Sequence, residues 1–177
     1  MKGALFSVVA DVVVEHFGEQ MWDEVLAAAG AEGAYTSLGD YPSTELSRLV
    51  SALARRLEMS PTEVLVLTGR HGFTPLARHH PDVVAGFTGW RDLLLALDGV
   101  IHVEVHKLYP GAATPRFAVE TCGSGLLVEY SSHRHLCRLA EGLIVGSAQW
   151  YGQQVTIEHR SCELDGDHHC VLEVQPA

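Results

Sequence analysis

The chain has 177 residues, 47% of them hydrophobic and 19% charged, and its formal net charge is −10. Single domains commonly run to roughly 100–200 residues, so this length predicts one globular domain over residues 1–177. The acidic charge and the mere 12 Lys and Arg residues argue against nucleic acid and anionic lipid as partners, and no apolar run approaches the ~20 residues that cross a membrane.

The first segment predicts a helix and not an export signal. Phe6, Val9 and Val13 recur at helical spacing. Asp11 and Glu15 interrupt the apolar stretch, and no small-residue cleavage site follows. We therefore expect the protein to be cytoplasmic.

The middle of the chain predicts further helices. Ser60 and Glu63 have the spacing of a capping box, in which each side chain bonds the other residue's backbone N–H. Pro75 and Pro81 then interrupt the pattern, which predicts a short helix or turn. A longer helix follows over residues 88–107.

The last third is rich in strand-forming residues. Segments 116–122 and 125–132 predict one hairpin, and segments 153–162 and 168–174 predict a second hairpin about Asp165-Gly166. A helix lies between the two hairpins.

This order of elements predicts an α+β fold. We expect a helical N-terminal half packed on a C-terminal four-stranded antiparallel sheet with helices. The helical subdomain would cover about residues 1–65, and the sheet subdomain about residues 66–177.

His102 is a candidate ligand near the end of the long helix. It lies on or beside the apolar stripe, where a histidine is more often a hydrogen-bonded core residue than a ligand. His106, four residues on, shares its helix face, so the two imidazoles also have the spacing of a partial zinc site.

A second candidate set is Tyr130-Ser131-Ser132-His133-Arg134. The alternate residues Tyr130, Ser132 and Arg134 offer two hydroxyls and a guanidinium, which suit carboxylate binding. The alternative is that Ser132 caps the next helix while the other two side chains face solvent.

A third set has the composition of a closed structural zinc site. It consists of Cys137, His159, Cys162 and Cys170. His168 or His169 is an alternative fourth ligand, and two buried thiols with a stray surface histidine are the metal-free alternative. Cys122 is not part of the set, and we expect it to be a buried, inert thiol.

These features together resemble the H-NOX family, the haem nitric oxide/oxygen binding domains of bacteria and of soluble guanylate cyclase. The stretches that carry the likeness are Met1-Lys2-Gly3, LDGVIHVEV around His102, GAATPRF with Pro115, and EYSSHR. The order of elements also fits, so the resemblance covers essentially the whole chain.

The resemblance implies a haem b buried between the two halves. His102 would be the axial ligand of the iron. Tyr130, Ser132 and Arg134 would hold the haem propionates. Pro115 would press on the macrocycle and distort it.

The resemblance also implies a choice of gas. Oxygen-binding members carry a distal Tyr at the position of Leu139, and Leu5 and Val9 occupy other pocket positions. Bound oxygen is retained best by a hydrogen-bond donor. An apolar pocket therefore predicts binding of nitric oxide and carbon monoxide and exclusion of oxygen.

The implied function is a nitric oxide sensor and not an enzyme. Loss of the Fe–His102 bond would change the surface that regulates a partner in trans, a histidine kinase or a cyclic-di-GMP enzyme. Several H-NOX proteins with such partners carry the same Cys/His pattern, which supports zinc and suggests thiol redox chemistry. No phosphate loop or acid/base pair points to catalysis.

Two alternatives belong to other classes. One is an apolar-ligand binding domain similar to the 4-vinyl reductase type, which would leave His102 and the Tyr130 set unexplained. The other is a zinc-dependent thiol redox switch or small hydrolase built on the Cys/His set.

Overall fold

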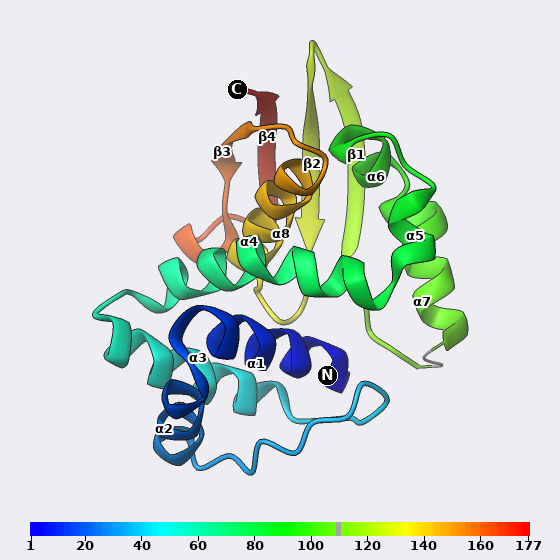
Figure 1. Cartoon of the computed structure of the whole chain (residues 1–177). Coiled ribbons are helices and arrows are strands. Elements are labelled where there is room, and N and C mark those ends of the chain that lie inside the picture. Colours follow the sequence, from blue (N-terminus) through cyan, green and yellow to red (C-terminus); the bar gives the residue numbers. More distant parts are fainter. Residues whose placement is uncertain (109–110) are drawn as a thin grey trace.

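The structure is a computed structural model that describes residues 1–108 and 111–177. Within these residues, eight α-helices and one four-stranded antiparallel sheet confirm the α+β class. The first four helices are α1 (Gly3–Phe17), α2 (Glu19–Ala29), α3 (Ser43–Leu57) and α4 (Pro61–His79). Figure 1 shows α4 crossing the molecule between α1–α3 and the half that contains the sheet.

Helix α4 begins at the predicted capping box. The Glu63 N–H donates to Ser60 Oγ at 3.2 Å, and the Ser60 N–H donates to Glu63 Oε2 at 2.8 Å. The predicted break at Pro75 is wrong, because Pro75 lies buried inside α4 and the helix continues to His79. A proline removes one helical hydrogen bond, and packing of α4 against both halves of the molecule offsets that loss.

The sheet has the strand order β1-β2-β4-β3, with every neighbouring pair antiparallel. Its strands are β1 (Arg116–Cys122), β2 (Gly125–Ser131), β3 (Val155–Ser161) and β4 (Cys170–Pro176). Both predicted hairpins are confirmed, and β3 pairs irregularly with β4 between His159 and Ser161.

Helix α8 (Cys137–Trp150) packs against α4 through backbone contact. A Cβ on Gly142 would lie 2.2 Å from the Val66 carbonyl oxygen, and a Cβ on Gly69 would lie 2.3 Å from the Leu139 carbonyl oxygen. Only glycine lets two helices approach this closely.

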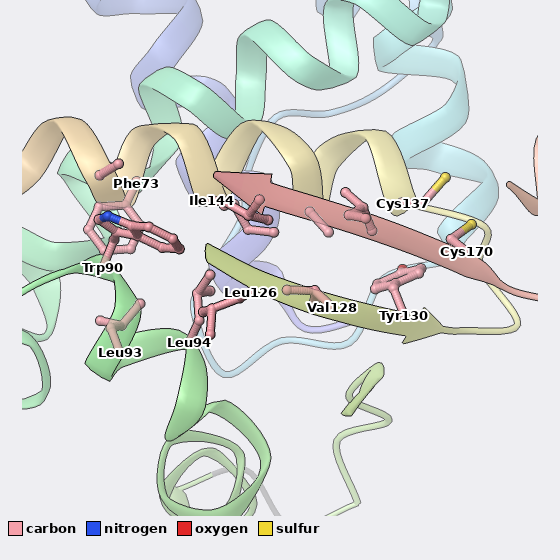
Figure 2. Close-up of a cluster of buried hydrophobic side chains, with 14 of the residues drawn as sticks. Phe73, Trp90, Leu93, Leu94, Leu126, Val128, Tyr130, Cys137, Ile144 and Cys170 are labelled. Atoms are coloured by element: carbon pink, nitrogen blue, oxygen red, sulfur yellow. The ribbon is translucent and has the colours of Figure 1, made fainter. Parts of the chain in front are cut away.

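Two apolar clusters fill the interior. One joins α1, α2 and α3 and includes Val64 at the start of α4. The other joins the sheet, α6 (Trp90–Leu95), α8 and the end of α4. Figure 2 shows Leu126, Val128 and Tyr130 of β2 within the second cluster. The subdomain division near residue 65 stays a prediction.

No helix in the described residues is long and apolar enough to cross a bilayer.

Candidate functional site

The helix that leads to His102 is interrupted by a widened turn. The predicted continuous helix over residues 88–107 is wrong. The chain forms α6 (Trp90–Leu95), then a π-helix (Leu97–Ile101), then α7 (His102–Leu108). The Val100 and Ile101 N–H groups both donate to the Ala96 carbonyl oxygen, at 2.9 and 3.1 Å. The Asp98 side chain, in the same turn, bonds His102. Single π-turns occur frequently at functional sites.

His102 is held by a carboxylate that sequence analysis missed. Its Nδ1 lies 2.7 Å from Asp98 Oδ1, and the His102 side chain is 15% exposed. A carboxylate accepts hydrogen bonds, so this contact places the imidazole proton on Nδ1 and leaves the Nε2 lone pair available. The signal in the sequence is the i, i+4 spacing of the two residues on one helix face.

The other Asp98 oxygen reaches the sheet. Asp98 Oδ2 accepts the backbone N–H of Phe117 at 2.8 Å, near the start of β1. The Phe117 ring lies 5.7 Å from the His102 ring and 5.3 Å from the Tyr130 ring. One short segment thus connects His102 with the Tyr130 set.

The Tyr130 set lies at the end of β2 and in the turn that follows. Tyr130 is 2% exposed, and burial raises its pKa to about 12, against the opposing effect of a hydrogen bond with Ser132. Ser132 Oγ accepts the Arg134 N–H at 3.2 Å, and the Arg134 guanidinium donates to the Ala113 carbonyl. The alternative of Tyr130 facing solvent is wrong.

These residues have the chemistry that a haem requires. Three side chains carry protonated donors suited to two propionate carboxylates, and one imidazole keeps a free nitrogen for iron. Pro115 is half-buried and lies two residues before Phe117, and Arg134 bonds the same segment at Ala113. The donor set therefore fits the group.

Two of the three expected distal residues are buried. Leu139 on α8 is 6% exposed and Val9 on α1 is 3% exposed, while Leu5 is half-buried. Their place on one face of a haem stays a prediction.

Three of the four expected zinc ligands come together. The Sγ atoms of Cys137, Cys162 and Cys170 lie within 4.8 Å of one another, with Cys162 at 3.8 Å from Cys137 and 4.0 Å from Cys170. Figure 2 shows Cys137 at the start of α8 and Cys170 on β4 near the Tyr130 end of the cluster. Burial raises the pKa of the Cys137 and Cys170 thiols, and the neighbouring thiols add to the effect on Cys137.

His159 lies outside that group of three thiols. Its Nε2 is 3.0 Å from Glu141 Oε2, while its Nδ1 is buried without a hydrogen-bond partner among the described residues. His168 and His169 are both exposed. The orphaned Nδ1 makes His159 the better candidate for a fourth ligand, because buried polar atoms usually have a partner.

Cys122 differs from expectation. The predicted buried thiol is wrong, because Cys122 is exposed at the end of β1. It occupies the outward position where β1 meets the hairpin turn, and β1 is an edge strand.

Comparison with known proteins gives a consistent result. A family model described as Haem-NO-binding matches residues 2–159. An H-NOX protein from S. oneidensis in the Fe(II)NO ligation state is 36% identical, and the match covers 100% of this chain and 99% of that chain with a TM-score of 0.93. Curated proteins give no significant match.

Two further solved structures are similar over the same length. The H-NOX domain from Shewanella oneidensis in the Fe(II)CO state is 35% identical, covering 100% of this chain and 99% of that chain with a TM-score of 0.90. Unliganded Fe(II) H-NOX from K. algicida is 27% identical, covering 100% and 97% with a TM-score of 0.86. Since the family model spans most of the chain and these structures match its full length, the chain belongs to the H-NOX family of haem-binding gas-sensor domains, which are not enzymes.

Proposed function

We propose that the protein is a nitric oxide sensor whose haem iron is held by His102. The observation that carries the proposal is the hydrogen bond between the His102 imidazole and Asp98. Its Nδ1 is bonded to Asp98, which orients the ring and leaves Nε2 as the only lone pair for a metal. Haem-ligating histidines need this tautomer.

Tyr130, Ser132 and Arg134 would anchor the haem through its two propionates. The raised pKa of Tyr130 keeps its hydroxyl protonated at neutral pH, so it can donate to a carboxylate. Arg134 adds a permanent positive charge. Once bound, the haem would supply an iron position for a gas.

The choice of gas would rest on the apolar residues Leu139, Leu5 and Val9. None of them can donate a hydrogen bond, so bound oxygen would lack the partner that retains it. Nitric oxide and carbon monoxide need no such donor. The similar S. oneidensis proteins carry nitric oxide or carbon monoxide on Fe(II), which supports this choice.

Signalling would begin at α7. His102, the first residue of α7, would hold the iron, so a change in that contact would be passed directly to α7, and Pro115 would press on the haem. A ligand drives such a change only when its free energy differs between the two arrangements, and loss of a metal bond supplies that difference. We propose a partner in trans in the cytoplasm, a histidine kinase or a cyclic-di-GMP enzyme.

We also propose that the three buried thiols bind one structural zinc with His159. Three thiolates and one imidazole complete a tetrahedral shell. Metal binding would remove the protons that burial now favours on the Cys137 and Cys170 thiols. His159 would have to turn its buried Nδ1 to the metal, and Glu141 would then orient the ring through Nε2.

The visible spectrum of protein from haem-supplied cells tests the haem proposal. We expect a Soret band that is lost in His102→Ala and returns when imidazole is added. His106→Ala is the matched control, because His106 bonds Thr114 at 2.9 Å and should leave the band unchanged. A colourless wild type would favour the apolar-ligand alternative.

Exposure of the reduced protein to air tests the choice of gas. We expect no stable oxy spectrum, while nitric oxide and carbon monoxide each shift the Soret band. A persistent oxy spectrum would contradict the assignment of Leu139 to the distal pocket.

Metal analysis tests the zinc site. We expect about one zinc per chain, lost in Cys162→Ser with haem retained. Cys122→Ser is the control, since its thiol is exposed and remote from the three-thiol group. Equal zinc in the wild type and Cys162→Ser would refute the site.

A further inference from the structure

We propose that Asp98 is a positioning residue that sets the tautomer of His102 and connects this imidazole to the first strand of the sheet. The proposal deepens the proposed function and rests on it only where His102 is taken to ligate iron. Asp98 itself would not touch the haem iron.

The two oxygens of Asp98 serve different partners. Oδ1 lies 2.7 Å from His102 Nδ1, and Oδ2 accepts the Phe117 N–H at 2.8 Å. Both are normal hydrogen-bond lengths. One carboxylate therefore links the first residue of α7 to the second residue of β1.

The position of Asp98 in a π-helix makes this double contact possible. Asp98 is the second residue of the widened turn, four residues before His102, and its side chain is partly exposed. A regular helix would direct an i, i+4 carboxylate along its own surface. Here the same carboxylate also reaches the backbone of another element.

The carboxylate controls the proton on His102. Oδ2 accepts the Phe117 N–H and Oδ1 faces His102 Nδ1 as a second acceptor, so the proton sits on Nδ1 and the Nε2 lone pair stays free. An amide at position 98 would behave differently. Its single oxygen can still accept the Phe117 N–H, but its NH₂ would then donate to His102 Nδ1 and move the imidazole proton to Nε2, the atom required by iron. A wrong tautomer of this kind is the handicap of an Asp→Asn change beside a catalytic histidine.

A second link ties α7 to the same segment. His106 Nε2 lies 2.9 Å from Thr114 Oγ1, just before Pro115. Displacement of α7 would therefore pull on both ends of residues 114–117. Movement of His102 would therefore be transmitted through these two contacts to β1, which forms one edge of the sheet.

The first experiment needs no haem. Nitrogen-15 NMR of the apoprotein reports which ring nitrogen of His102 carries the proton. We expect the Nδ1–H form in the wild type, the Nε2–H form in Asp98→Asn, and loss of the Nδ1–H preference in Asp98→Ala. Hydrogen exchange at the Phe117 amide should stay slow in Asp98→Asn and become fast in Asp98→Ala.

The second experiment uses the haem-loaded protein. Resonance Raman spectra of the ferrous form should show the Fe–His stretch at lower frequency in both variants, because the imidazole loses its carboxylate partner. Haem transfer to excess apomyoglobin should be about tenfold faster. The control is Glu104→Gln, which removes a similar charge from an exposed residue of α7 that bonds Lys107.

The outcomes separate the two proposals. An unchanged His102 tautomer in both Asp98 variants would overturn the role of Asp98, whether or not haem binds. The expected tautomer changes in a protein that takes up no haem would sustain that role and overturn the gas-sensor function of this chain. If Glu104→Gln has the same effect as Asp98→Asn, the loss of one negative charge alone would explain the change, and the proposal would be overturned.

Discussion

At the scale of single residues, burial changes the pKa of Tyr130. The hydroxyl lies at the end of β2 in a cluster that includes Cys137 and Cys170, and burial raises its pKa to about 12. A raised pKa means that the folded protein binds the phenolic proton more tightly than the unfolded chain does. The associated stability is therefore complete below pH 10 and is lost as the pH rises from 10 to 12.

Tyr130→Phe should remove this alkaline sensitivity. Between pH 10 and pH 12 the wild-type apoprotein should lose about 2 kcal/mol more unfolding free energy than Tyr130→Phe, which is most of the effect of a two-unit pKa difference. Urea denaturation at a series of pH values measures both proteins. Parallel curves for the two would contradict the buried, protonated phenol.

Single-residue chemistry was only partly readable from the sequence. His102, Tyr130 and the three buried cysteines stand out because their side chains and spacings are distinctive. Asp98 did not, because an aspartate near a helix end usually faces solvent. Cys122 was misjudged because its exposure depends on β1 being an edge strand, which no local pattern reveals.

At the scale of elements, α4 and α8 cross in direct backbone contact. Gly69, Gly142 and Gly146 each place their missing Cβ against a backbone atom of the opposite helix. Backbone atoms cannot rotate away as a side chain can. The two helices are therefore fixed relative to each other.

Gly142→Ala should be strongly destabilising. Its Cβ would lie 2.2 Å from the Val66 carbonyl oxygen, so we expect a loss of about 3 kcal/mol in unfolding free energy, at the upper end for overpacking. Chemical denaturation measures the loss. Gly86→Ala is the control, because the nearest atom to its Cβ would lie 3.8 Å away. A cost below about 1 kcal/mol for Gly142→Ala would contradict the close crossing.

Element prediction succeeded where the signal is local. The Ser60 capping box and both hairpin turns depend on residues within a few positions of one another, and all three are confirmed. The helix through Pro75 and the π-turn before His102 depend on packing against distant elements. Tertiary contacts outweighed the local preference at both places.

At the scale of the whole molecule, the three-thiol group joins parts of the chain that are far apart in sequence. Cys137 begins α8, Cys162 follows β3, and Cys170 begins β4. A metal bound there would cross-link the helix and both strands of the second hairpin. Its removal should therefore weaken the sheet half as a unit.

A strong zinc chelator should lower the thermal midpoint of the wild type. A metal present at 100 times its dissociation constant contributes about 2.7 kcal/mol, so the shift should be several degrees. Differential scanning calorimetry measures it. Cys162→Ser should already melt at the lower temperature and respond little to chelator, while Cys122→Ser should respond as the wild type does. Identical melting of the wild type with and without chelator would contradict a structural metal.

The glycine contact also decides where the molecule can flex. Helix α4 meets α8 through its backbone, but it meets α1 through side chains, with Gly72 beside Val8 and the rings of His16 and His71 4.1 Å apart. Side chains can change rotamer and let one helix roll over another, whereas touching backbones cannot. If the N-terminal helices move relative to the sheet half, we expect the movement at the contact between α1 and α4. Helix α4 would then keep its position relative to α8 and the sheet.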